Sequence, residues 1–155
     1  MKIMFVCTGN ICRSAMADVM LKSKIKNTDL ENEIQVFSSG THADTGSHAT
    51  FTAIEAMEEL GIDLKPHRAT NIMDSNIEDM DLILCATSKH KRLILSIFPK
   101  LQDKIYTIKE FAEYKLESGL DISDPWGYDL YVYRSCASLL ENCIDNIILK
   151  IQKKG

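Results

Sequence analysis

Two residues near the amino terminus, Cys7 and Arg13, have the types and spacing needed for phosphoryl transfer. A cysteine thiolate is a nucleophile, and a guanidinium can bind an oxyanion through two parallel hydrogen bonds. Residues 2–6 predict a short buried strand, and residues 15–25 predict a helix. Stretch 7–14 is therefore a strand-to-helix turn, in which backbone amides and a helix N-terminus surround one point. We expect this positive environment to favour the thiolate form of the cysteine.

The other residues of this turn also suit an anion site. Asn10 tolerates the left-handed backbone that a tight amide cradle requires, and the Ser14 hydroxyl can donate to the thiolate. The alternative is a buried cysteine that closes a strand beside a solvated arginine, because this spacing also arises by chance. The preceding strand, the glycine, the serine and the following helix favour the anion site. We predict phosphate binding by Thr8, Gly9, Asn10, Ile11, Cys12, Arg13 and Ser14.

Displacement at phosphorus also needs an acid for the leaving oxygen and then a base for water, and one carboxylic acid can serve both steps. Asp124 is the best candidate, because Pro125 restricts its backbone in a loop after the last predicted strand. An Asp-Pro pair on its own more often marks a turn. Trp126 and Tyr128 follow closely, and their rings could wall the site and accept a flat substrate group.

The stretch from Val6 to Ser14 resembles the signature of the low molecular weight protein tyrosine phosphatases, and later segments extend the resemblance to most of the chain. The resemblance implies that the nucleophile is Cys7 and that Asp124 is the general acid and base. It also implies that His67, which precedes a basic residue, supports the anion loop through the asparagine; a plain surface histidine is the alternative. His42, His48 and His90 are expected on surface loops or helix faces.

A further implication of the resemblance concerns Cys12, which stands five residues after Cys7 in the same turn. A reversible disulfide between the two would protect the nucleophile from over-oxidation. The alternative is that Cys12 is only a small residue that fits. The other three cysteines, Cys85, Cys136 and Cys143, are expected in the core.

Composition limits the range of functions. With 155 residues, 45% hydrophobic and 26% charged, residues 1–155 predict a single globular domain. The net charge of −4 argues against nucleic acid or an anionic membrane as a partner, and no run is long enough to span a bilayer. Five cysteines fit a reducing compartment, and no cysteine or histidine group has the spacing of a zinc site. We expect a cytoplasmic monomer without cofactor or metal that acts on phosphorylated proteins.

Predicted strands and helices alternate along the chain. After the first strand, further strands are expected from residue 34 through 37 to an end at 38–40, at 81–86 and at 104–108. Longer helices are expected at 49–60, from the cap Ser88 to the stop at Pro99, and at 130–152. Phe51 is assigned to the apolar face of the helix at 49–60, and a short helix is expected near 74–78. This pattern predicts an α/β domain of the flavodoxin or Rossmann type: a four-stranded, parallel, twisted sheet with helices on both faces. In such folds ligands bind at the carboxyl ends of strands.

Four functions fit these residues. The first is a protein phosphotyrosine phosphatase, and the second is the protein-arginine phosphatase branch of the same family. That branch typically has threonine where this chain has Ile11, whose apolar side chain suits a ring better and favours phosphotyrosine. Arsenate reduction needs further relay cysteines, and Cys85 has Arg92 rather than a cysteine seven residues on. A non-catalytic phosphoresidue-binding module would not need both Cys7 and Asp124.

Overall fold

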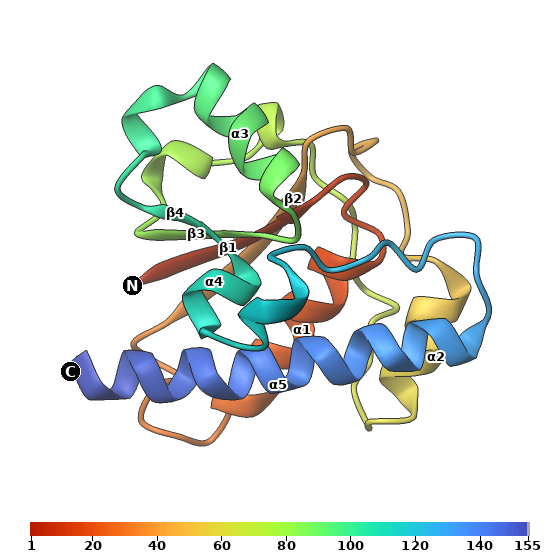
Figure 1. Cartoon of the computed structure of the whole chain (residues 1–155). Helices are drawn as coiled ribbons and strands as arrows, with labels where there is room; N and C mark the ends of the chain where they lie inside the picture. Colours follow the sequence, from red (N-terminus) through yellow and green to blue (C-terminus); the bar gives the residue numbers. More distant parts are fainter. Residues whose placement is uncertain (155) are drawn as a thin grey trace.

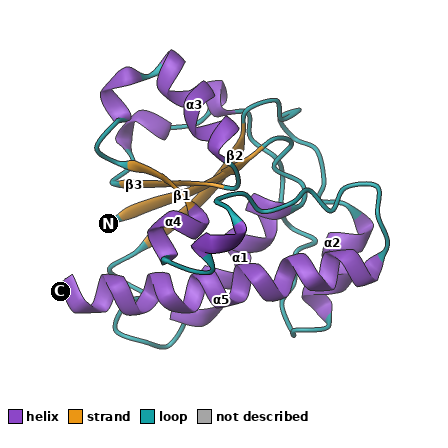
Figure 2. Cartoon of the chain, in the orientation of Figure 1, coloured by secondary structure: helices purple, strands orange, loops and turns teal. Residues whose placement is uncertain are grey.

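Four short strands form one all-parallel sheet through the middle of the molecule (Figures 1 and 2). The computed structural model describes residues 1–154. The strands are β1 (Lys2–Cys7), β2 (Gln35–Gly40), β3 (Leu82–Cys85) and β4 (Ile105–Thr107), in the order β2-β1-β3-β4. β1 is central, since it pairs with β2 on one side and with β3 on the other. The α/β class, the parallel sheet and its four strands are as the sequence predicts.

Helices cover both faces of this sheet (Figure 2). The helices are α1 (Arg13–Ile25), α2 (Phe51–Glu58), α3 (Ser88–Ile97), α4 (Ile108–Ala112) and α5 (Leu130–Lys154). α3 lies on one face, whereas α1, α2, α4 and the long α5 lie on the other, where α5 packs along α1, α2 and α4 (Figure 1). Within residues 1–154, none of these helices has the length and apolar character that crossing a bilayer would require.

The alternation of β1 side chains explains why there are two cores. Ile3 and Phe5 point into the larger cluster, which α1 and α5 cover, while Met4 and Val6 point into the smaller cluster beneath α3. Successive residues of a strand face opposite sides, so a strand that is apolar at every position needs cover on both faces. The continuous apolar run of β1 thus requires the layered architecture.

Some helix boundaries differ from the predicted ones in ways that affect the site. α1 begins at Arg13 rather than at Ala15, so the last residues of the predicted turn form the first helical turn. Thr87, not Ser88, caps α3, because its side chain accepts from the amide of His90. The helix expected near 74–78 is instead two 3-10 turns, Ile72–Asp74 and Ile77–Asp79.

The prediction for Phe51 is wrong: its side chain is 91% exposed. α2 buries Ala53, Ala56 and Met57, which are spaced as one face of a helix. Phe51 precedes Ala53 by two residues, which turns it by about 200° around the helix and away from this face. The residue type alone places Phe51 on the apolar face, whereas its position at the start of the helix turns it to solvent.

The topology places the end of β1 at the point where strand order reverses. From β1 the chain crosses first to β2 on one side and later to β3 on the other. The loops that leave the carboxyl ends of β1 and β3 therefore separate and open a crevice between them. Cys7 is the last residue of β1, so it stands at this crevice.

The end of β2 packs so closely against the loop after β1 that it admits only glycine. A Cβ on Gly40 would lie 2.4 Å from the carbonyl oxygen of Thr8 and 2.9 Å from the amide nitrogen of Asn10. We expect Gly40→Ala to lower the free energy of unfolding by about 1–3 kcal/mol, because backbone must shift to relieve the overlap. Urea unfolding measures this change.

Gly9→Ala is the matched control, since its Cβ would meet only the Ile11 side chain, at 3.4 Å. It should lose clearly less stability than Gly40→Ala. Equal unfolding midpoints for the two variants would contradict the close packing described for Gly40.

Candidate active site

The loop from Thr8 to Cys12, which joins β1 to α1, is held in an uncommon backbone conformation. Asn10 has a φ of 56°, in the left-handed region, and it is fully buried. Its side chain donates from Nδ2 to Ser14 Oγ at 2.8 Å and accepts from the amide of Thr70 at 2.9 Å. Its carbonyl oxygen accepts from Nε2 of His67 at 2.7 Å. The asparagine thus fastens the loop to two other segments of the chain.

Cys7 lies beneath this loop beside Ser14. The Cys7 Sγ is 2.9 Å from Ser14 Oγ and accepts from the Ser14 amide at 3.4 Å. Because Asn10 donates to the serine oxygen, the serine proton is directed to one of two acceptors, the sulfur or the carbonyl of Ser39 at 3.3 Å. The sulfur therefore sits among hydrogen-bond donors, which stabilise its negative form.

The loop amides are free to bind a ligand. In the described part of the chain, residues 1–154, the backbone amides of Gly9 to Cys12 donate to no protein acceptor. The loop carbonyls, by contrast, are used: Thr8 O accepts from the amide of His42 and Ile11 O from the amide of Thr50. Free amides next to a helix N-terminus are suited to an oxyanion.

Arg13 reaches the same place from the first turn of α1. Its side chain is buried, and Nη1 donates to the carbonyl of Ile122 at 2.8 Å. Nη2 lies 3.5 Å from Thr8 Oγ1 and 3.5 Å from Asp124 Oδ2. Among the described residues Nε has no partner, so a donor of the guanidinium is still available to an anion.

A pocket of about 260 Å³ opens where these groups meet. Its lining comprises Cys7, Thr8, Gly9, Ile11, Cys12, Arg13, Asp124 and Trp126. The Asp124 carboxylate is half exposed, and its Oδ1 accepts from the amide of Trp126 at 3.1 Å, which fixes the start of this turn. Tyr128, expected as a second aromatic wall, is exposed and does not line the pocket.

The structure brings a histidine to the site that sequence reasoning missed. His90 is not on the surface but 7% exposed, and that prediction is wrong. Its Nε2 lies 2.8 Å from Thr8 Oγ1, and its Nδ1 lies 2.8 Å from Thr87 Oγ1. Burial, followed by the positive charge of Arg13, lowers the pKa of His90 to about 4. A signal was present: the histidine lies in the first turn of a helix that begins shortly after β3, the strand next to β1.

Cys12, which also lines the pocket, is buried and is held by two hydroxyls. Its Sγ lies 3.2 Å from the Tyr133 hydroxyl and 3.7 Å from Thr50 Oγ1. Burial raises the pKa of the Cys12 thiol, as it does for the core thiols Cys136 and Cys143, to about 12 and about 11. All five cysteines are free. Within residues 1–154, no group of cysteine, histidine and carboxylate side chains is arranged to hold a metal ion.

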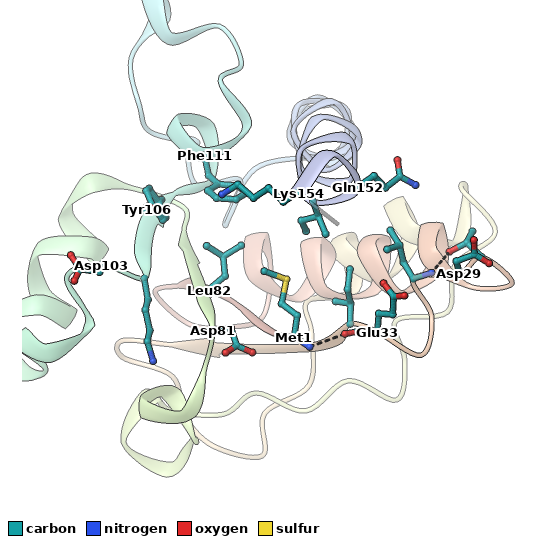
Figure 3. A pocket seen from close by; sticks show the side chains of 15 residues that line it. Met1, Asp29, Glu33, Asp81, Leu82, Asp103, Tyr106, Phe111, Gln152 and Lys154 are labelled. Carbon is teal, nitrogen blue, oxygen red and sulfur yellow. Dashed lines mark hydrogen bonds between the residues drawn. The ribbon is translucent and has the colours of Figure 1, made fainter.

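A larger groove, of about 950 Å³, lies at the opposite edge of the sheet (Figure 3). It is bordered by the amino ends of the strands, and carboxylates including Asp29, Glu33, Asp81 and Asp103 stand around it (Figure 3). None of the predicted phosphate-binding or catalytic residues lines this groove. The predicted catalytic residues Cys7, Arg13 and Asp124 all line the smaller pocket instead.

Comparison with known proteins gives the same family throughout. The model of the family described as low molecular weight phosphotyrosine protein phosphatase matches residues 2–155. A protein-arginine-phosphatase of Geobacillus stearothermophilus is 38% identical over 153 residues, covering 97% of this chain and 96% of the relative. A probable low molecular weight protein-tyrosine-phosphatase, EpsP, of Ralstonia solanacearum is 29% identical, covering 99% and 97%.

Solved structures agree in fold along the whole chain. The low molecular weight protein tyrosine phosphatase of T. tengcongensis has a TM-score of 0.87 and 38% identity, covering 97% of this chain and 99% of that one. The YwlE arginine phosphatase of Geobacillus stearothermophilus has a TM-score of 0.88 and 36% identity, covering 99% and 94%. The chain therefore belongs to the low molecular weight phosphotyrosine protein phosphatase family.

Proposed function

We propose that this protein hydrolyses phosphotyrosine in proteins through a cysteinyl-phosphate intermediate formed on Cys7. The observation that carries the proposal is the combination of a sulfur among donors, amides without acceptors and a buried guanidinium around one small pocket. The three non-bridging oxygens of a phosphoryl group share its negative charge and accept hydrogen bonds, so they are suited to these donors. The attacking atom and the anion-binding groups come from one continuous stretch, 7–14.

In the first step, the Cys7 thiolate attacks phosphorus and forms a P–S bond while the bond from phosphorus to the ester oxygen breaks. Asp124 transfers its proton to the departing oxygen, which leaves as an alcohol or phenol. Support for this role comes from its carboxylate, which lies at the pocket 3.5 Å from the Arg13 guanidinium. Arg13 and the loop amides hold the equatorial oxygens, where charge accumulates in the transition state.

In the second step, Asp124, now ionised, takes a proton from a water molecule whose oxygen attacks phosphorus. The P–S bond breaks, phosphate leaves, and the sulfur recovers its negative charge. Ser14 supports this departure, because its hydroxyl can donate to the sulfur across 2.9 Å. His67 acts at a distance by holding the carbonyl of Asn10.

The choice of phosphotyrosine depends on the walls of the pocket. Ile11 and Trp126 both line it and give it apolar surface. The depth of a cradle with its cysteine at the bottom favours a long aromatic ester over phosphoserine. The second candidate is phosphoarginine, which is favoured by the names of two relatives, the protein-arginine-phosphatases of Geobacillus stearothermophilus and Bacillus subtilis, at 38% and 35% identity.

We also propose that the protein works as a cytoplasmic monomer that binds neither nucleic acid nor membranes. Five free cysteines suit a reducing compartment. The groups that the proposed mechanism uses, Cys7, Arg13 and Asp124, all lie in one chain. The net charge of −4 gives no general attraction to polyanions.

Two variants test the covalent mechanism. Cys7→Ser should abolish steady-state hydrolysis, and Asp124→Asn should lower kcat about 10² to 10⁴-fold, the range for loss of a general acid. Asp103→Asn, which removes a carboxylate at the opposite edge of the sheet, should leave kcat unchanged. Release of phosphate from an aryl phosphate measures all three. Undiminished hydrolysis by Cys7→Ser would overturn the mechanism.

Substrate preference is tested at Ile11. We expect kcat/KM of the unaltered protein to be higher for a phosphotyrosine peptide than for the phosphoarginine peptide of the same sequence. Ile11→Thr should reduce the ratio about tenfold, because a polar hydroxyl replaces apolar surface in the pocket wall. Ile11→Val, which has the shape of threonine without the hydroxyl, is the matched control. A preference for phosphoarginine with isoleucine in place would reverse the assignment.

Oxidation is a further property of this site, and we propose that Cys12 protects Cys7. Peroxide converts the Cys7 thiolate to a sulfenic acid, and the Cys12 sulfur then attacks it and expels water to form a disulfide. Cys12 must first leave the hydroxyl of Tyr133, which lies 3.2 Å from its sulfur. Mass spectrometry after mild peroxide should detect the linked pair, and Cys12→Ser should yield Cys7 sulfinic acid instead. Recovery of only sulfinic acid from the unaltered protein would contradict the proposal.

A further inference from the structure

His90 joins α3 to the phosphate loop, although 82 residues separate it from Thr8. It stands in the first turn of α3, which starts directly after β3, and its ring lies between two threonine hydroxyls. Thr87 belongs to its own turn, whereas Thr8 lines the pocket. The ring therefore connects the first turn of α3 with a side chain that lines the pocket.

The directions of the hydrogen bonds follow from which atoms can only donate. Arg13 Nη2 can only donate, so Thr8 Oγ1, 3.5 Å away, is its acceptor. The Thr8 proton can then point at His90 Nε2, at 2.8 Å, and in this assignment the ring proton lies on Nδ1, which faces Thr87. A neutral histidine serves this chain of bonds, and the low pKa of His90, caused first by burial and then by Arg13, keeps the ring neutral at pH 7.

The charged and titratable groups around the ring come from several segments. Arg13 and His42 disfavour a positive charge on His90, while Asp121 and Asp124 favour it less strongly than burial opposes it. Thr8 and Thr87 are uncharged. The histidine is therefore placed to orient a neutral hydroxyl, not to supply a proton or a charge.

The same turn after β3 also anchors the acid loop. The carbonyl of Ala86 accepts from the amide of Ile122, and the amide of Ser88 donates to Asp121 Oδ1 at 2.8 Å. The carbonyl of Ile122 in turn accepts from Arg13. The turn thus fixes the segment before Asp124 through its backbone and fixes Thr8 through His90.

We propose that His90 is a positioning residue, which orients the Thr8 hydroxyl and through it holds Arg13 in the geometry that binds the phosphoryl group. The proposal rests on the phosphatase function proposed above. It assigns His90 no contact with the substrate.

Substituting His90 by glutamine and by asparagine tests the two contacts of its ring separately. The amide of His90→Gln can reach the position of Nε2 and bond Thr8, whereas that of His90→Asn reaches only the position of Nδ1 near Thr87. We expect His90→Asn to lower kcat/KM and to weaken competitive inhibition by inorganic phosphate, each about tenfold, as for one lost hydrogen bond to a binding group. His90→Gln should stay within about threefold of the unaltered protein.

Thr8→Val tests whether the histidine acts through the threonine. This change removes the hydroxyl while keeping the shape of the side chain, and it should reduce phosphate binding to the level of His90→Asn. The double variant should then be no worse than either single variant, because both interrupt one chain of bonds. His48→Asn, at an exposed histidine, is the control and should leave both measurements unchanged.

Nitrogen NMR of the ring gives a readout that does not depend on turnover. His90 should show a proton on Nδ1 and none on Nε2 at pH 7, and Thr8→Val should shift the Nε2 resonance. If the unaltered protein hydrolyses no phosphate ester, the proposed function fails, and the NMR result still tests the bond. If hydrolysis is found but His90→Asn matches the unaltered protein, or the single losses add in the double variant, the positioning role is overturned.

Discussion

The site depends on backbone amides, those of Gly9 to Cys12, that have no acceptor among residues 1–154. Unpaired amides are costly when buried, so a loop that leaves them open must be held in shape by other contacts. In this chain those contacts use the loop's carbonyls and one asparagine: the carbonyls of Thr8 and Ile11 accept from neighbouring segments, and Asn10 bonds Ser14, Thr70 and His67. The left-handed backbone at Asn10 is stable because these bonds determine it.

This arrangement explains why residues far apart in the sequence surround one small pocket. The nucleophile and the anion-binding groups lie together in the chain, but their supports come from the end of β2, the segment near Thr70, the turn after β3 and the acid loop. All of these segments meet at the carboxyl ends of the parallel strands. The reversal of strand order at β1 creates the crevice, and the neighbouring loops surround it and hold the loop after β1 in place.

The sequence predicted what is local and missed what is formed between distant segments. The strand and helix around 7–14 were recognisable because apolar runs, spacing and a nucleophile coincide within eight residues. His90 and Tyr133 carry no such pattern; their importance comes from a hydroxyl or a sulfur that another segment brings within 3.2 Å. Phe51 failed for the opposite reason, because residue type suggested burial and only the helix phase shows its exposure.

The floor and the walls of the pocket have different chemical tasks. The floor consists of main-chain amides, a sulfur and a guanidinium, and these groups interact with the phosphoryl oxygens, which are the same in every phosphorylated residue. It therefore cannot distinguish tyrosine from arginine. Under the proposed function, that distinction falls to the apolar side chains of the pocket lining, Ile11 and Trp126. This division of tasks fits a family that includes relatives named for phosphotyrosine and for phosphoarginine, because the bonds that shape the cradle use neither the Ile11 nor the Trp126 side chain.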